Sequence, residues 1–341
     1  MAGLGTDVEY GGMEYTTLGR TGLRVSVAGL GCGGFSRLGI STGGTEAAAV
    51  AIVRLALDSG INVIDTAAQY GTEKIVGQAI RDVPRDQVVV ATKCLANTGG
   101  VAITAAALID SMENSLRQLG TDHIDVFQLH AVYPHQYDAA MTDLLPALVR
   151  AREQGKVRFL GLTEAGETDQ HHDMLRRAAG DGVWDTGMVA YNMLHRTAAE
   201  HLFPHTLGAG MGILVMHAVR SIFARPPFLA ATIRALVAEG KLSPALAEQD
   251  GPLDFLVHEG GASSVTEAAY RFARHSDGVD VVLFGTGSAA HLRANVAALS
   301  RPALPAADVA VLLALFAEVS GLGLERPGAP QLGMPAAGAK P

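Results

Sequence analysis

The chain has 341 residues, of which 48% are hydrophobic and 18% charged, and its formal net charge is −8. That length can bury a sizeable core, as one large domain or two ordinary ones. It has no apolar run long enough to cross a bilayer and no Lys/Arg cluster along any helix, so we expect neither a membrane-spanning protein nor a nucleic-acid-binding one.

The termini and the cysteines indicate where the folded domain lies and in which compartment. Residues 1–13 and 323–341 are predicted to be flexible, which leaves a single domain over residues 14–322. The N-terminus shows no basic-then-apolar signal pattern. Cys32 and Cys94 lie far apart in strand-like contexts, with no disulfide framework and no zinc spacing. We expect a reduced, cytoplasmic protein without a metal site.

A short β-hairpin turned at Gly19 to Gly22 is predicted first, and after it one pattern repeats. A brief apolar run is followed by a polar loop and then an amphipathic helix. The runs are Ser26 to Gly31, Asn62 to Asp65, Val88 to Lys93, Ile124 to His130, Val157 to Thr163, Met188 to Asn192, Ile213 to Met216 and Val281 to Gly285. Most are continuously hydrophobic, which is typical of parallel strands buried on both faces.

Helices are predicted between these runs, with glycines marking their ends. One covers Ala47 to Ser59 and ends at Gly60, another ends at Gly120, and a third ends before Gly155. Eight strand–helix units in about 250 residues match the α/β class and its closed (β/α)₈ TIM barrel. A doubly wound open sheet is the alternative.

A long insertion, residues 218–262, separates the seventh run from its helix. Segments of this length are usually functional or carry small helices, and "PPFLAATIRALVAEGKL" is predicted to be one such helix. Several apolar residues there suggest a lid over the barrel mouth, although a merely structural excursion stays open. They are Ile222, Phe223, Pro226, Pro227, Phe228 and Leu229.

Four ionisable residues are predicted to meet at the carboxyl ends of the strands. Asp65, Lys93 and His130 end the second, third and fourth runs, and Tyr70 lies in the loop after the second. Each alone has an ordinary structural explanation, but together they must compensate one another's charge in one pocket. A lysine can stabilise the phenolate of a tyrosine, so Tyr70 could protonate a developing alkoxide while His130 orients the substrate oxygen.

The motifs "LGRTGLRVSVAGLGCGGF", "DTAAQYG", "ATK", "QLH", "GKVRFLGLT", "AYNML" and "FGTGSAAHLRANV" occur in an order and spacing that resemble the aldo-keto reductase superfamily. The resemblance implies an NADP(H)-dependent oxidoreductase that interconverts a carbonyl and an alcohol, with Asp65, Tyr70, Lys93 and His130 as the catalytic tetrad and Tyr70 as general acid. The cofactor contacts that it implies are Gly31, Cys32, Gly33, Asp65, Thr163, Glu164, Met188, Met216, His217, Gly285, Thr286, Gly287, Ser288, His291, Arg293 and Asn295.

Some positions depart from the family pattern. Thr163 and Glu164 stand where many members carry Ser-Asn, Met188 replaces a glutamine, and Met216 stands in place of a stacking aromatic. A fourth departure is His291, which occupies a position where NADP(H)-preferring members commonly have arginine. We therefore expect a modest preference for NADP(H), with NAD(H) accepted.

The partner is expected to be a small and fairly apolar carbonyl or alcohol, and the chain a monomer or a weak homo-oligomer. Three alternatives stay open. The first is an NAD-dependent sugar (aldose) 1-dehydrogenase of the same family. The second is a non-catalytic NADP(H)-binding regulatory subunit. The third is a phosphate-binding barrel isomerase or lyase with Lys93 as a Schiff base.

Overall fold

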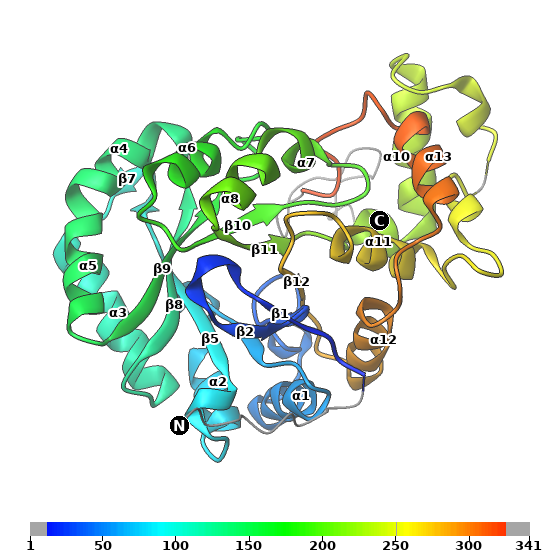
Figure 1. Ribbon diagram of the computed structural model, residues 1–341. Helices are drawn as coiled ribbons and strands as arrows, with labels where there is room; N and C mark the ends of the chain where they lie inside the picture. Colours follow the sequence, from blue (N-terminus) through cyan, green and yellow to red (C-terminus); the bar gives the residue numbers. More distant parts are fainter. Residues whose placement is uncertain (1–11, 250, 325–341) are drawn as a thin grey trace, which may run out of the picture.

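Figure 1 shows the computed structural model, which describes residues 12–249 and 251–324. Eight parallel strands close into a barrel in the order β10-β11-β12-β3-β4-β5-β8-β9. They are β3 (Ala28–Gly31), β4 (Val63–Asp65), β5 (Val89–Leu95), β8 (Ile124–Val132), β9 (Val157–Glu164), β10 (Thr186–Ala190), β11 (Gly212–Met216) and β12 (Val281–Phe284). Each coincides with a predicted apolar run to within a few residues. Closure confirms the barrel and excludes the open sheet.

Helices surround the barrel, and the glycines expected to end three of them do so. Those around the barrel include α1 (Glu46–Asp58), α2 (Glu73–Ile80), α3 (Ala105–Leu119), α5 (Leu145–Glu153), α6 (Asp173–Asp181), α8 (Phe203–Ala209), α11 (Val265–Arg274) and α12 (Ala289–Leu299), and α13 (Ala306–Leu315) follows them in the chain. Gly60, Gly120 and Gly155 have φ angles of 86°, 66° and 74°. Glycine tolerates this left-handed conformation because it has no Cβ. Among the described residues no helix is long and apolar enough to cross a membrane.

The predicted hairpin is present and closes the amino-terminal end of the barrel. Its strands are β1 (Tyr15–Thr17) and β2 (Arg24–Ser26), which pair antiparallel. Leu18, Leu23 and Val25 are buried and pack with interior residues of the barrel strands such as Val63 and Val281. The opposite, carboxyl-terminal end is therefore the end that offers a site.

The insertion contains the predicted helix but not an open apolar lid. It carries α9 (Ser221–Ala224), which packs against α11, and α10 (Pro226–Ala238). Further along the insertion, His258 Nε2 lies 2.9 Å from the Asp308 carboxylate of α13. Ile222, Phe223, Phe228 and Leu229 are only 1–4% exposed and belong to the main hydrophobic core. These side chains pack the insertion onto the barrel, so their burial does not support their assignment as a substrate-facing lid surface.

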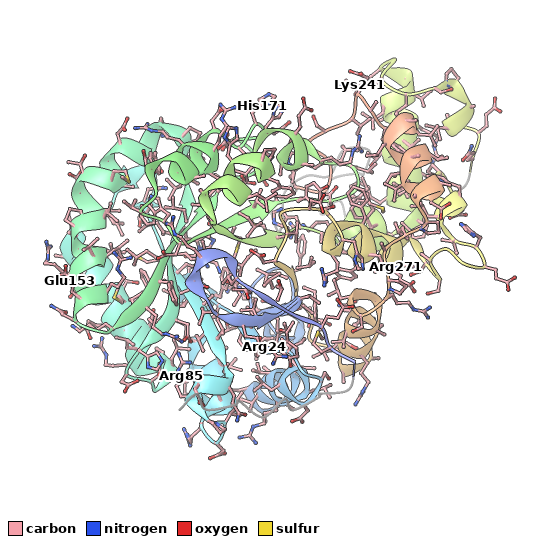
Figure 2. The ribbon with its side chains drawn as sticks, viewed as in Figure 1. Arg24, Arg85, Glu153, His171, Lys241 and Arg271 are labelled. Atoms are coloured by element: carbon pink, nitrogen blue, oxygen red, sulfur yellow. The ribbon has the colours of Figure 1, made fainter. Side chains whose placement is uncertain are left out.

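Both ends of the described part of the chain pack onto the barrel domain. Met13 is buried in the core, so the packed domain includes at least this residue of the N-terminal segment expected to be flexible. At the other end, Arg271 of α11, labelled in Figure 2, is buried and donates to the backbone oxygens of Pro302 and Ala303. This fixes the chain leading into α13. The tail expected to be flexible begins at residue 323, but Gly323 and Leu324 are packed, and Leu324 is buried. The remainder of that tail lies outside the described residues.

Candidate active site

Lys93 and Asp65 form a buried ion pair inside the carboxyl end of the barrel. The register pairs Asp65 with Ala91 of β5, and Lys93, two residues further along, points to the same side of the strand as Ala91. Lys93 is 0% exposed; its Nζ donates to the Asp65 carboxylate and, at 2.9 Å, to the oxygen of Thr66. Burial raises the pKa of the Asp65 carboxyl, and the Lys93 ammonium opposes that change. Each charge therefore depends on the other.

Tyr70 lies against this pair because the loop after β4 turns sharply. The turn Ala68–Tyr70 ends at Gly71, whose φ is 71°. Lys93 Nζ lies 5.4 Å from the centre of the Tyr70 ring. Burial, with the nearby Asp65 charge, raises the pKa of Tyr70 well above its ordinary value. The hydroxyl consequently keeps its proton, as a proton donor must.

Gly33 creates the space that the tyrosine ring occupies. A Cβ built on this glycine would lie 2.5 Å from the ring of Tyr70, closer than carbon atoms can approach. The family resemblance of the sequence predicts that Gly33 contacts the cofactor. The structure gives it a second role, which is to let Tyr70 reach the barrel mouth.

His130 completes the predicted group of four. Its ring lies 5.7 Å from that of Tyr70, edge to face, and its Nδ1 lies 2.8 Å from Nε2 of Gln69. An amide nitrogen donates, so Nδ1 accepts and the ring proton resides on Nε2. Burial, and then the charge of Lys93, lowers the pKa of His130 to about 3. The result is a neutral imidazole whose Nε2–H has no hydrogen-bond partner among the residues that the structure describes. Gln69 was not predicted, although it directly precedes Tyr70.

A bulge in β8 follows His130 and depends on Thr163. The register between β8 and β9 shifts between Leu129 and Val132, and Ala131 has a φ of 53°. The Ala131 N–H donates to Oγ1 of Thr163 at 2.7 Å. Since the Thr163 hydroxyl accepts this bond, its own proton stays available to a ligand.

Backbone strain is concentrated at this end of the barrel. Among the described residues, five that are not glycine have a left-handed φ, and all lie at or after the carboxyl ends of β3, β8, β9 and β11. They are Arg37, Leu38, Ala131, His172 and His217. Such conformations cost about 1–3 kcal/mol each and collect at functional sites, where the surroundings impose them.

The residues proposed to hold a cofactor line the same end. The Cys32 N–H donates to the oxygen of Asp65 at 2.7 Å, which ties the loop containing Gly31 and Cys32 to the tetrad. Met188 pairs with Thr163 in the sheet and packs inside the barrel with Met216. These thioethers occupy interior positions beside the Thr163 hydroxyl.

The loop after β12 is held in a compact turn that begins α12. Thr286 Oγ1 accepts from the Ser288 N–H at 3.0 Å, and Ser288 caps the helix by accepting from the His291 N–H at 3.4 Å. A Cβ on Gly287 would lie 2.4 Å from the Cα of Gly39, so the loops after β12 and β3 touch there. Gly285, at the end of the strand, would carry a Cβ 3.1 Å from the oxygen of Gly31.

Three further predicted contacts lie along α12. His291 and Arg293 are exposed, and Asn295 is half-buried. His291 and Asn295 are four residues apart and share a helix face, whereas Arg293 does not lie on that face. An anion at the start of α12 would be favoured by the helix dipole.

Glu164 and His217 are arranged differently from the other predicted contacts. Both carboxylate oxygens of Glu164 are bonded within the protein: Oε1 accepts from the Ala190 N–H at 2.8 Å, and Oε2 lies 2.7 Å from Nδ1 of His172. His217 Nδ1 is buried without a hydrogen-bond partner among the described residues. Burial lowers the pKa of His217 to about 3, so the ring is neutral. His217 is thus the better placed of the two to contact a ligand.

Comparison with known proteins identifies the family to which the chain belongs. The model of the Aldo/keto reductase family matches residues 29–315. L-galactose dehydrogenase of Arabidopsis thaliana is 37% identical over 157 residues, which cover 44% of this chain and 48% of that protein. Aldo-keto reductase YhdN of Bacillus subtilis (strain 168) is 34% identical over 202 residues, covering 57% and 58%. The matches thus span about half the length of these relatives.

A solved structure supports the fold over nearly the whole chain. The holo form of aldo-keto reductase AKR11C1 from Bacillus halodurans is 24% identical, covers 89% of this chain and 96% of its own, and superposes with a TM-score of 0.69. At this level of identity the likeness concerns the barrel alone. Because the family model covers most of the barrel, the chain belongs to the aldo/keto reductase family.

Proposed function

We propose that the protein is an NAD(P)H-dependent oxidoreductase that interconverts a small carbonyl compound and its alcohol, with Tyr70 as general acid. The observation that carries the proposal is the buried Lys93–Asp65 pair beside a protonated Tyr70 and a neutral His130. These four side chains come from β4, its following loop, β5 and β8, and they converge on one end of the barrel. A buried charge pair there has a chemical use as well as a structural one.

The residues divide the chemistry of reduction between them. A nicotinamide cofactor, when bound, would supply the hydride that the carbonyl carbon receives. Tyr70 donates its hydroxyl proton to the carbonyl oxygen, and His130 Nε2–H donates a hydrogen bond that orients this oxygen. The Lys93 ammonium stabilises the phenolate that Tyr70 becomes, while Asp65 holds Lys93 in place. In oxidation of an alcohol the proton returns to Tyr70.

The chain offers suitable positions for the cofactor. The Thr163 hydroxyl, Met188 and Met216 would contact the nicotinamide, since thioethers pack well on ring faces. The first turn of α12, with Thr286 and Gly287, would hold phosphate, because free backbone N–H groups point outward at a helix N-terminus. We propose NADP(H) as the preferred cofactor and NAD(H) as an accepted one.

The substrate is proposed to be fairly apolar. Phe35, in the loop that follows β3, is 45% exposed, and the guanidinium carbon of Arg220 lies 4.9 Å from the centre of its ring. We infer that this exposed aromatic side chain, in a loop at the carboxyl end of the barrel, would contact an apolar ligand. We propose no partner chain as a requirement for activity.

A second candidate is oxidation of an aldose at its first carbon. The name of the Arabidopsis relative, L-galactose dehydrogenase, favours it, and the four residues can act in either direction. A regulatory subunit without turnover would have no need of the Lys93–Asp65 pair beside Tyr70 and His130.

A substrate panel tests both candidates. Aldehydes and ketones are supplied with NADPH or NADH, and alcohols and aldoses with NADP⁺ or NAD⁺, while the nicotinamide absorbance is followed. Turnover of apolar carbonyls supports the first proposal, and turnover of aldoses alone supports the second. Binding of NADPH without turnover on any compound would contradict both.

A further inference from the structure

A buried hydrogen-bond chain lies on the side of the mouth away from the tetrad. From Glu164 Oε2 it passes to Nδ1 of His172 at 2.7 Å, from Nε2 of His172 to Oγ1 of Thr197 at 2.9 Å, and from there to Nε2 of His195 at 3.5 Å. The two histidine rings are 5.5 Å apart and both are 0% exposed. No member of this chain belongs to the tetrad.

The His195 end of this hydrogen-bond chain contacts residues 316–324, which we call the C-terminal segment. The Gly321 N–H donates to Nδ1 of His195 at 3.0 Å. Asn192 Nδ2 donates to the oxygen of Leu322 at 3.0 Å, and Arg196 Nη2 to that of Phe316 at 2.6 Å. After α13 the backbone accordingly returns to the loop after β10, near α7 (Thr197–His201) in Figure 1.

Asn192 also connects the segment to the residue that follows β11. Asn192 Nδ2 lies 3.4 Å from the oxygen of His217, the residue directly after that strand. A Cβ built on Gly323 would lie 3.5 Å from the side chain of Ile222, which belongs to α9. The segment thus borders the mouth along β10 and β11, across from the strands that carry Asp65, Lys93 and His130.

The bonds define one consistent arrangement of protons. Because Nδ1 of His195 accepts from Gly321, its ring proton is on Nε2 and is donated to Thr197. Burial lowers the pKa of His195 to about 3, so this ring is neutral. The Thr197 hydroxyl can then donate to Nε2 of His172, whose Nδ1–H donates to Glu164. Each polar atom is used, and a break would leave a buried group unpaired.

The Glu164 end of the hydrogen-bond chain adjoins the proposed nicotinamide site. Glu164 follows Thr163, whose hydroxyl holds the bulge after His130. His172 has a left-handed φ of 58°. Its neighbour His171 lies at the outer surface, as Figure 2 shows, and is exposed. The strained turn therefore selects which of two adjacent histidines enters the core.

We propose that the chain Glu164–His172–Thr197–His195 is a positioning device that fixes the C-terminal segment beside the mouth and thereby sets which substrates fit. This proposal rests on the proposed function, because it assumes that the protein binds a carbonyl or alcohol substrate. Its four residues are positioning residues, because they act through the segment. Loss of the bond to Gly321 frees the segment, which should alter the binding of bulky carbonyls more than the reaction of small ones.

The test compares His195→Leu with His195→Asn and, as a surface control, His171→Leu. Asparagine keeps an acceptor oxygen at the position of Nδ1, whereas leucine keeps the bulk without any acceptor. We expect amide exchange of residues 316–324 to rise about tenfold in His195→Leu, and far less in the other two. We also expect KM for a bulky ketone to change by about fivefold or more in His195→Leu, with kcat for a small aldehyde within twofold.

Two outcomes would overturn the proposal. One is wild-type exchange of residues 316–324 in a folded His195→Leu variant; the other is equal exchange in the Leu and Asn variants. If His195→Leu does not fold, Thr197→Val against Thr197→Ser serves in its place, with the same expectations. Exchange is measured without any substrate, so failure of the proposed function would show separately, as absence of turnover in the wild-type protein.

Discussion

The two halves of the barrel mouth are built in different ways. On the β4–β5–β8 side, single residues at strand ends meet as the register dictates, and the Lys93–Asp65 pair joins adjacent strands. On the β9–β11 side, the groups that meet lie on loops, and a C-terminal segment more than 100 residues further along the chain completes the contact with His195. We propose that the first half carries out proton transfer. The second half carries Thr163, Glu164 and Met188, which depart from the family pattern, and we propose that substrate specificity varies there.

Removing the charge of Lys93 should have the largest effect. Lys93→Met leaves the Asp65 carboxyl buried without its partner, which typically costs about 3–5 kcal/mol of stability. Lys93→Met combined with Asp65→Asn should regain most of this loss, because no lone charge remains, yet should stay inactive. Urea unfolding and steady-state rates of both variants check this. A double variant as unstable as the single one would show that charge compensation is not what holds the tetrad half together.

Thr163 joins the two halves, so its substitution is expected to reach the tetrad. Thr163→Val removes the acceptor for the Ala131 N–H, which costs about 1–3 kcal/mol. We expect kcat/KM to fall by about tenfold to a hundredfold, while Thr163→Ser retains activity within a few-fold. Comparable rates for Val and Ser would mean that the bulge after His130 is maintained without this hydroxyl.

The buried histidines of the second half predict how stability depends on pH. The pKa of His195 is lowered to about 3 by burial first and then by His172, Arg196 and His171. The unfolded chain therefore binds a proton at this residue below its usual pKa of about 6.5, and the native protein does not. Stability should fall as pH drops below that value, by up to about 1.4 kcal/mol per pH unit from His195.

The substitution His195→Asn isolates the contribution of His195 to the pH dependence of stability. His130 and His217 also lower stability as the pH falls, and they are present in both proteins. The variant should lose about 2 kcal/mol less than wild type between pH 7 and pH 5, as measured by urea unfolding at each pH. Parallel curves for the two proteins would contradict the burial of a neutral imidazole at this position.

The smallest expected effect concerns cofactor choice at α12. His291→Arg places a permanent charge on the helix face that also carries Asn295, and a guanidinium matches phosphate oxygens. We expect the ratio of kcat/KM for NADPH to that for NADH to rise by about threefold to tenfold. Arg293→Gln serves as the matched comparison: a larger change there than at His291 would make Arg293 the residue that recognises the phosphate.

The barrel could be predicted because its strands leave local patterns in the sequence. The meeting of Asp65, Tyr70, Lys93 and His130 at one end of the barrel follows from their positions at or after strand ends. Strands buried on two faces appear as apolar runs, and a charge that ends such a run must find a partner. The apolar pattern around Phe228 predicted the helix but could not tell core from pocket lining. Gln69 and the bond between Thr163 and Ala131 depend on which side chains meet after folding. The chain from Glu164 to His195 depends, in addition, on a left-handed φ at His172 that the sequence does not mark.

The substitution Tyr70→Phe tests the proposed role of Tyr70 most directly, because it removes only the hydroxyl group that would donate the proton. We predict that the rate of carbonyl reduction falls by about 10²-fold to 10⁴-fold, while the Kd of NADPH stays within twofold of wild type. Single-turnover reduction and a fluorescence titration of the cofactor measure the two quantities on the same protein. A variant that reduces carbonyls within a few-fold of the wild-type rate would contradict the assignment of Tyr70 as general acid.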